Sequence, residues 1–273
     1  MNKIEVKVLD CFQSPGNTMM FLAKLTQRGH SVSNMKDLLH LYNSTQAKAA
    51  TVAAVSALPH GTIKRFCPIT VAIVGASRRF LAQARTHQVG FNYVSASLQY
   101  SDYSGKADFV VPYALLEADQ ALKEKYGTHK VCLPSERYLS ACEGAMHTYG
   151  RIAAETDNDT AGYVAPQGLR NILIMQGNHE AWLNFIRLRS CNRNTNETQY
   201  VTLKIWEELL KTPDGVEMFK YAGPDCMFGA CQEGKMRCDN SLRKFVGVSR
   251  KENITIPRAI LDAKWPLLKE VNE

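Results

Sequence analysis

The stretch of the chain richest in possible ligand-binding groups is residues 77–101, with the sequence SRRFLAQARTHQVGFNYVSASLQYS. It contains no glutamate or lysine, which a solvated surface normally carries, and is dense in other polar side chains: Arg78, Gln83, Arg85, His87, Gln88, Asn92, Ser97 and Gln99. The aromatic residues Phe91, Tyr93 and Tyr100 are interleaved with them. This mixture is typical of a site that binds a flat, polar ligand, although an ordinary solvated face is the alternative.

A second candidate is one face of a helix expected over residues 178–189. Asn178, Trp182, Phe185 and Arg189 are spaced so that they share this face. An arginine on a partly buried face needs a planar acceptor. Glu197 can provide it as a structural partner; the functional alternative is a carbonyl or phosphate of a ligand.

Motifs for catalysis without a cofactor are absent from the sequence. No Ser-His-Asp arrangement, no cysteine in a catalytic context, no Walker A loop and no GxGxxG element is present. An enzyme of this sequence therefore needs a cofactor for its chemistry. Cys226, Cys231 and Cys238 lie close together in the sequence, but three thiols lack the fourth ligand of a structural zinc site, so we expect no metal.

Composition indicates an ordinary globular protein. The chain has 273 residues, of which 45% are hydrophobic and 22% charged, so it can bury a sizeable core. The net charge of +7 is spread along the chain and favours anionic small molecules or nucleic acid, or is merely a basic surface. The longest apolar run, residues 69–76, is too short to cross a bilayer, and no signal-peptide pattern is present. We expect a soluble cytoplasmic protein.

The hydrophobic patterns predict one α+β (α/β) domain with helices packed around a central sheet. Strands are expected at residues 4–9, 69–76 and 171–175, with a strand-like stretch at 109–111. A helix carrying Arg78 and Arg79 follows the second strand. Further helices are expected at residues 18–27, 34–42 (capped by Ser33), 114–126, 135–156, 178–189 and 197–211. A Glu207–Lys211 pair is expected on the last helix, and the tail from residue 223 reads as loop.

The segment RTHQVGFNYVSASLQYS resembles the signature of the ThyX family, the flavin-dependent thymidylate synthases. That signature is RHR, or RTHR in some members, followed by a spacer and SxRY. Arg85, Thr86 and His87 match the opening, and Ser97 and Tyr100 match the serine and tyrosine of SxRY. The spacing agrees without a gap.

Flanking segments extend the resemblance over most of residues 1–240, which leaves residues 241–273 as a C-terminal extension. HGTIKRFCPITVAIVGASR is similar to the family's HESxxEHxxFTFxIxGxSR, with these matches: His60, Thr62, Thr70, Gly75, Ser77 and Arg78. NHEAWLNFIRLRSCNRNTNE is similar to NxRxLxxFLxLRxCxxAQWE, with these matches: Asn178, Phe185, Leu188, Arg189, Cys191 and Glu197. The tail GPDCMFGACQEGKMRC resembles the cysteine-bearing end of many members.

The resemblance implies an enzyme that methylates dUMP reductively at C5 of the pyrimidine to give dTMP. It implies FAD, methylenetetrahydrofolate as the carbon donor and NADPH as the reductant. It also implies a homotetramer whose active sites form where subunits meet. No nucleic-acid or membrane partner is expected.

The resemblance also implies residue roles. Arg189 is the catalytic residue, which polarises a carbonyl of the pyrimidine. The residues implied in cofactor binding are His60, Thr62, Arg85, His87, Asn178, Asn184 and Arg193. Those implied in substrate binding are Gln83, Gln88, Ser97, Gln99, Tyr100 and Arg189.

Several family arginines are replaced in this sequence. Gln88 stands at the last arginine of RTHR, Gln99 at the arginine of SxRY, and Gly162 at the arginine of the ExAR segment. Arg65 replaces an acidic residue, and AQWE has become NTNE at residues 194–197. In the family the SxRY and ExAR arginines hold the nucleotide phosphate, and each such contact is worth about 1.5–3 kcal/mol.

Three hypotheses follow from these replacements. The chain makes dTMP, with local cations replacing the lost arginines: Arg65, Arg78, Arg79 and Arg193. Alternatively, it applies the same flavin and folate chemistry, with methyl or hydroxymethyl transfer, to another pyrimidine nucleotide such as dCMP, UMP or a modified base. In the third hypothesis it is a catalytically silent protein that binds a nucleotide or flavin.

Overall fold

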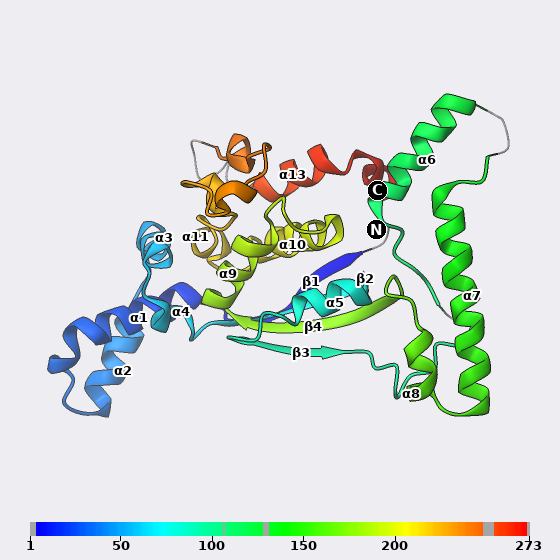
Figure 1. Cartoon of the computed structure of the whole chain (residues 1–273). Coiled ribbons are helices and arrows are strands. Elements are labelled where there is room, and N and C mark those ends of the chain that lie inside the picture. Colours follow the sequence, from blue (N-terminus) through cyan, green and yellow to red (C-terminus); the bar gives the residue numbers. More distant parts are fainter. Residues whose placement is uncertain (1–3, 106, 128–130, 248–253, 272–273) are drawn as a thin grey trace.

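A four-stranded antiparallel sheet forms the centre of the computed structural model, which describes residues 4–105, 107–127, 131–247 and 254–271. The strand order is β1-β2-β4-β3 (Figure 1), and the strands are β1 (Glu5–Cys11), β2 (Pro68–Ser77), β3 (Phe91–Ser95) and β4 (Arg170–Asn178). The apolar run 69–76 forms β2. This strand lies inside the sheet between β1 and β4, as its composition predicts.

One face of the sheet is buried beneath helices. Val71 pairs with Met175 and Ile73 with Leu173 across β2 and β4, and all four side chains are inaccessible to solvent. Three helices join these strands in one hydrophobic core: α5 (Arg78–Ala84), α9 (His179–Arg189) and α10 (Asn196–Leu209). The predicted α+β class with helices packed on a central sheet is therefore confirmed.

The opposite face of the sheet carries apolar side chains that stay exposed. Val74 pairs with Ile172 across β2 and β4, and Val94 lies on the neighbouring β3. Their exposed fractions are 42%, 47% and 69%. The helices α9 and α10 lie on the other side of the sheet (Figure 1). An apolar patch of this kind is typical of a contact surface.

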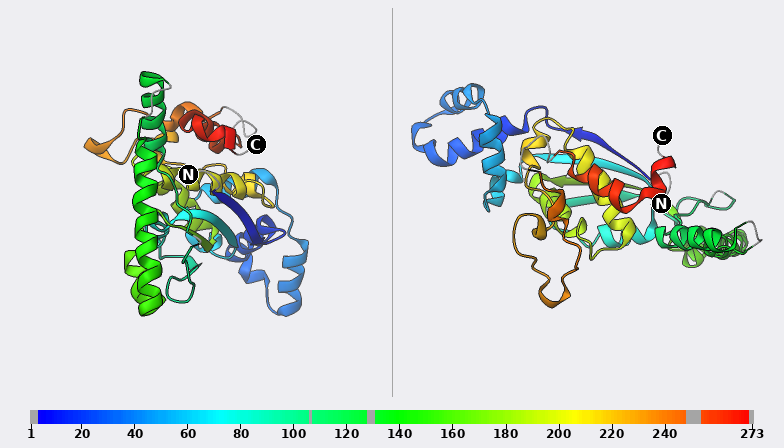
Figure 2. Two further views of the ribbon diagram at one scale, coloured as in Figure 1. Left: turned by 90° about the vertical axis from the view of Figure 1, so that its right-hand side faces the viewer. Right: turned by 90° about the horizontal axis from the view of Figure 1, so that it is seen from above.

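Two groups of helices project from opposite ends of the sheet (Figure 2). At one end lie α1 (Pro15–Arg28), α2 (Met35–Ser44), α3 (Ala49–Ala57) and α4 (Gly61–Lys64). At the other lie α6 (Tyr113–Tyr126), α7 (Pro134–Glu155) and α8 (Asn158–Ala161). One face of α7 packs into a second hydrophobic cluster, where Cys142, Met146 and Tyr149 meet Leu98 and Leu169.

The C-terminal segment differs from the loop that its composition predicts. After the short helix α11 (Gly215–Met218), the segment from residue 223 onward forms α13 (Ile256–Lys264), which packs on α10. Ile260 and Trp265 are buried in the main core. The helix was not predicted because the segment directly after residue 223 is rich in glycine and cysteine, which indicates a loop. The apolar residues that form and bury the helix come about 30 residues later.

Local details also depart from expectation. Asn34 rather than Ser33 caps α2, because its side chain accepts the backbone N–H of Asp37. Residues 109–111 make only an isolated bridge between Phe109 and Leu169. The ion pair expected between Glu207 and Lys211 does not form. Glu207 pairs instead with Arg258, and Lys211 pairs with Glu208.

Candidate functional site

Helix α9 presents the face that its spacing predicts. Asn178 caps the helix by accepting the backbone N–H of Ala181 at 2.9 Å. Trp182 and Phe185 are fully buried, and the indole of Trp182 donates to the carbonyl of Ile69 at 3.1 Å. The aromatic part of the face thus anchors the helix to β2. Its last residue, Arg189, is only partly buried and stands at the edge of the core.

The guanidinium of Arg189 is held by four hydrogen bonds. Its Nε donates to Nε2 of His87 at 2.7 Å, and Nη1 donates to the side-chain oxygen of Asn194 at 3.1 Å. Its Nη2 donates to the Thr86 hydroxyl at 2.7 Å and to the Gln83 carbonyl at 3.3 Å. These contacts fix the plane of the guanidinium. The supporting roles of Thr86 and Asn194 were not expected from the sequence.

All four acceptors are neutral, so Arg189 keeps an uncompensated positive charge. Among the described residues no carboxylate forms an ion pair with it. The alternative that Glu197 pairs with Arg189 is wrong. That carboxylate accepts the backbone N–H and the hydroxyl of Ser77 at 2.7 and 2.5 Å instead. Burial lowers the pKa of Arg189 from its ordinary value, yet guanidinium groups remain charged in proteins.

His87 is a neutral acceptor at this site. Burial, and then the positive charge of Arg189, lower the pKa of the imidazole to about 4. Its Nε2 accepts from Arg189, so the proton of the neutral ring is on Nδ1. The ring packs edge-on against Phe185, with 4.9 Å between the ring centres. His87 therefore orients Arg189 without adding charge.

The segment from Arg85 to Gly90 separates two pockets. A pocket of about 450 Å³ is lined on one side by His87, Arg189 and Arg193. A pocket of about 430 Å³ on the other side is lined by Gln88 and Gly90, together with polar residues of the sheet and loops: Arg65, Asn92, Gln176 and Asn178. Each is large enough for one ring system with its polar substituents, which is the ligand type inferred from the sequence.

The turn at Gly90 brings this segment against the start of α9. Gly90 has φ +78°, a conformation that side chains disfavour. An added Cβ would lie 3.0 Å from the Ala181 side chain and 3.0 Å from the amide nitrogen of Asn178. The glycine is therefore needed for the close approach that forms the second pocket.

The side chain of Gln83 forms hydrogen bonds to other residues of the same chain. Its side-chain oxygen accepts from the hydroxyl of Thr195 at 3.2 Å and from that of Thr198. The predicted role of Gln83 in substrate binding therefore rests on its amide NH₂ alone. The hydrogen bonds of Thr195 and Thr198 to Gln83 were not expected, because local sequence spacing gives no information on a partner more than 100 residues away.

The remaining predicted cofactor residues lie around this centre. Arg193 shares the first pocket with Arg189, and Asn178 lines the second. His60 and Thr62 are exposed at α4, which contacts α9. Asn184 is exposed on α9, and its oxygen accepts from Arg187 at 3.1 Å. Arg85 donates a hydrogen bond to the Ser95 hydroxyl on β3.

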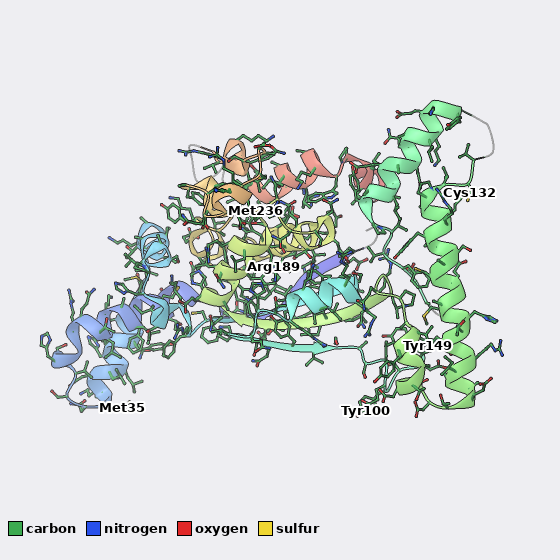
Figure 3. The ribbon with its side chains drawn as sticks, viewed as in Figure 1. Met35, Tyr100, Cys132, Tyr149, Arg189 and Met236 are labelled. Atoms are coloured by element: carbon green, nitrogen blue, oxygen red, sulfur yellow. The ribbon has the colours of Figure 1, made fainter. Side chains whose placement is uncertain are left out.

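The structure does not bring Ser97, Gln99 and Tyr100 to Arg189. They form a turn beyond β3, and Figure 3 places Tyr100 well away from Arg189. The Ser97 hydroxyl accepts the backbone N–H of Gln99 at 3.1 Å, and Tyr100 is 82% exposed. An added Cβ on Gly162 would lie 3.4 Å from Leu98. Two of the three positions that lack a family arginine, 99 and 162, are therefore close in space.

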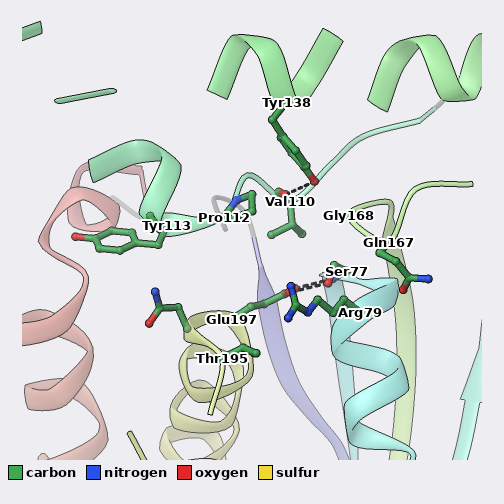
Figure 4. A pocket seen from close by; sticks show the side chains of 12 residues that line it. Ser77, Arg79, Val110, Pro112, Tyr113, Tyr138, Gln167, Gly168, Thr195 and Glu197 are labelled. Atoms are coloured by element: carbon green, nitrogen blue, oxygen red, sulfur yellow. Dashed lines mark hydrogen bonds between the residues drawn. The ribbon is translucent and has the colours of Figure 1, made fainter. Parts of the chain in front are cut away.

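The four cations considered as replacements have different surroundings. Arg65 pairs with Glu180 at 2.6 Å, and Arg193 lines the Arg189 pocket. Arg79 lines a third pocket of about 330 Å³, beside the hydrogen-bonded Ser77 and Glu197 (Figure 4). Arg78 is partly buried, and burial lowers its pKa, whereas the neighbouring Tyr103 raises it and Arg85 lowers it. Arg78 is thus the candidate beside the 97–103 loop.

Comparison with known proteins gives a consistent set of relatives. The family model described as "Thymidylate synthase complementing protein" matches residues 7–212. The flavin-dependent thymidylate synthase of Clostridium tetani is 23% identical over 253 residues, covering 86% of this chain and 93% of the relative. The enzyme of the same name from Pyrococcus furiosus is 27% identical over 192 residues, covering 68% and 73%.

The fold is shared with proteins of known structure. One of them is the UMP/dUMP methylase PolB from Streptomyces cacaoi bound with 5-Br dUMP, with a TM-score of 0.60 and 15% sequence identity. The match covers 82% of this chain and 97% of PolB. In the described part of this chain, no helix is both long enough and apolar enough to cross a membrane.

Proposed function

The chain belongs to the family of thymidylate synthase complementing proteins, and we propose that it methylates a pyrimidine nucleotide at C5, converting dUMP to dTMP. The observation that carries this proposal is the guanidinium of Arg189. It is fixed by four neutral acceptors and has no ion-pair partner among the described residues. A fixed, uncompensated cation at the mouth of a pocket is suited to stabilise negative charge that develops on a ring carbonyl.

Arg189 makes C5 of the pyrimidine reactive. A hydrogen bond from the guanidinium to a ring carbonyl withdraws charge onto that oxygen, which stabilises the electron-rich form of the ring in which C5 attacks a one-carbon unit. The neutral His87 holds Nε of Arg189, and Asn194 and Thr86 hold the other nitrogens. Because these contacts exist before a ligand binds, little reorganisation is needed during the reaction.

The two pockets beside Arg85–Gly90 have the donors that a flavin dinucleotide needs. Arg193 and Arg189 provide positive charge in the first, and the second presents Gln88, Asn92 and Asn178. The residues that would hold FAD are His60, Thr62, Arg85, His87, Asn178, Asn184 and Arg193. When bound, FAD supplies the redox chemistry, with NADPH as the reductant and methylenetetrahydrofolate as the carbon donor.

The nucleotide is proposed to bind between two chains of a homotetramer. Within one chain the turn with Ser97, Gln99 and Tyr100 lies apart from Arg189 (Figure 3). The exposed apolar face of the sheet, with Val74 and Val94, supports contact between copies. The substrate residues are then contributed by different chains: Gln83, Gln88 and Arg189 by one, and Ser97, Gln99 and Tyr100 by another. We propose that residues 1–240 form the catalytic part and residues 241–273 an extension, of which α13 packs on α10.

A second candidate is the same reaction, with methyl or hydroxymethyl transfer, on a different nucleotide such as UMP, dCMP or a modified base. It is favoured by the neighbouring positions of Gln99 and Gly162, which leave the phosphate region without two family arginines. Arg78, which is close enough to Tyr103 for their charges to interact, is proposed to take their place. A silent binding protein is the remaining possibility.

The test is incubation of the purified protein with FAD, methylenetetrahydrofolate, NADPH and a panel of pyrimidine nucleotides, followed by mass analysis of the products. Conversion of dUMP to dTMP supports the first candidate. A methylated or hydroxymethylated product from another nucleotide supports the second. A protein that cannot be reconstituted with FAD and converts no nucleotide would contradict both.

A further inference from the structure

Four cysteine thiols gather at the end of α9, outside the residues assigned to the reaction. They line a single pocket that holds about 40 Å³, and they are Cys191, Cys226, Cys231 and Cys238. We refer to them as the thiol cluster. All four are reduced and partly buried. Sequence spacing alone left three thiols without a fourth ligand, and the fold supplies it from Cys191, 35 residues before Cys226.

The size and composition of this pocket point to an ion rather than an organic ligand. A volume of about 40 Å³ is close to the roughly 30 Å³ that one water molecule occupies in the liquid, so no ring or sugar fits. Four thiolates around one small space match the ligand set of a closed structural zinc site. Soft sulfur ligands also disfavour magnesium and calcium.

Basic and polar groups around the thiol cluster can balance its charge. A divalent cation with four thiolates carries about two negative charges. Arg187 and Arg193 line the same pocket, but Asp225, which pairs with Arg187, and Glu233 line it too. The lining is therefore neutral, and Lys264 behind Asn192 is the cation that offsets the thiolates. The Asn192 amide donates toward Sγ of Cys238 at 3.8 Å, and its oxygen accepts from Nζ of Lys264 at 3.0 Å. Such outer contacts orient the ligands of a metal site and tune its charge.

We propose that the thiol cluster binds one thiophilic divalent cation, with zinc as its simplest occupant, and thereby fastens the C-terminal loop to the end of α9. No three metal-binding side chains of the described residues are already arranged around one point. The ion must therefore draw the ligands together. The loop can follow, because it contains two short 3-10 segments, Asp225–Met227 and Gly234–Met236, with turns between them.

The site would shape the wall of the Arg189 pocket. Cys191 lies two residues after Arg189, and Cys191, Arg193 and Glu233 line both pockets. Fixing the loop therefore also fixes Glu233 and the backbone around Arg193. The binding of the ion does not depend on the reaction proposed above, because it concerns a separate set of side chains.

The test uses the full chain, purified without chelator and then equilibrated with zinc and desalted. We expect about one zinc per chain by elemental analysis, and loss of most of it in Cys231→Ser and in Cys238→Ser. Cys132→Ser is the matched control, because Cys132 is exposed and outside the pocket. Zinc that is absent from the unaltered chain, or equal in Cys231→Ser and Cys132→Ser, would overturn the proposal.

A second measurement keeps the test valid if the serine variants do not fold. Cobalt added to the unaltered chain should give the intense thiolate-to-metal absorption of a tetrahedral sulfur site, and zinc should displace it. A thiol reagent should then find four fewer reactive cysteines in the zinc-loaded chain than after chelation. Cobalt spectra without thiolate bands, or unchanged thiol counts, would show that the cluster does not bind metal.

Discussion

Two segments that follow each other in the sequence differ sharply in how they are supported. Arg85–Gly90 is held by several hydrogen bonds. The hydroxyl of Tyr93 donates to the carbonyls of Ala84 and His87 at 2.9 and 2.5 Å, and the ring of His87 accepts from Arg189. The turn with Ser97, Gln99 and Tyr100 has little support, and Tyr100 is almost fully exposed. The groups proposed for chemistry are therefore preorganised within the chain, whereas those proposed for substrate recognition lie on its surface.

The largest effect on turnover is expected from removing the guanidinium of Arg189. Arg189→Ala should lower turnover of the nucleotide by at least about 100-fold, because it removes a charged donor aimed at developing negative charge. Flavin absorbance of the reconstituted protein should persist. Arg187→Ala is the matched control on the same helix, since Arg187 is exposed and pairs with Asp225. Unchanged turnover in Arg189→Ala would remove this residue from the mechanism.

A pair of glycine substitutions compares packing in the two regions. Gly90→Ala should lower the free energy of unfolding by about 2–3 kcal/mol, because it adds a close contact with Ala181 to the cost of positive φ. Gly105 has φ +69° and open space around it, so Gly105→Ala should lower the free energy of unfolding by only about 1 kcal/mol. Urea unfolding measures both values. Equal losses would mean that the Gly90 turn is as loosely packed as the surface loop.

Acidification should weaken the supported region. The pKa of His87 is about 4 in the folded chain, below the ordinary value of about 6.5 in an unfolded one. The unfolded chain therefore takes up the proton first, and stability is lost as pH falls from about 6.5 towards 4. The buried His179, with a pKa of about 4, adds to the loss. Unfolding of His87→Gln at several pH values should show a shallower decline in stability than unfolding of the unaltered chain. Identical slopes would contradict the expectation.

The smallest effect is expected in the exposed turn. Gln99→Arg should tighten binding of a nucleotide monophosphate by about two- to fivefold, because an exposed ion pair contributes at most about 1 kcal/mol. A lower KM with unchanged kcat is the expected signature. Gln120→Arg on α6 makes the same change in charge elsewhere and should leave KM as it was. A KM that is unaffected by Gln99→Arg would place the phosphate away from this turn.

The sequence predicted what depends on local pattern. The buried strand β2 and the face of α9 follow from short-range periodicity, and both are confirmed. The strand β3 was not predicted, because five residues with polar Asn92 and Ser95 give no clear alternation and the strand exists through its pairing with β4. The helix α13 was missed because its burial depends on packing against α10.

The site shows the same limit. The importance of Arg189 and His87 was predicted, but the hydrogen bond between them joins residues 102 positions apart. The correct partner of Arg189 could not be chosen from spacing, and Glu197 was considered because it is near in sequence. The structure assigns Glu197 to Ser77, 120 positions away. Contacts of this range depend on how the elements pack, which local pattern does not specify.

The exposure of the 97–100 turn has an evolutionary consequence. Substitutions at exposed side chains usually change the folding free energy by less than about 0.5 kcal/mol, so residues such as Gln99 and Tyr100 can vary without loss of the fold. Arg189 and its supports allow no such freedom. If the proposed roles hold, descendants of one ancestor can acquire new substrates by changes in this turn and keep the centre around Arg189 unchanged.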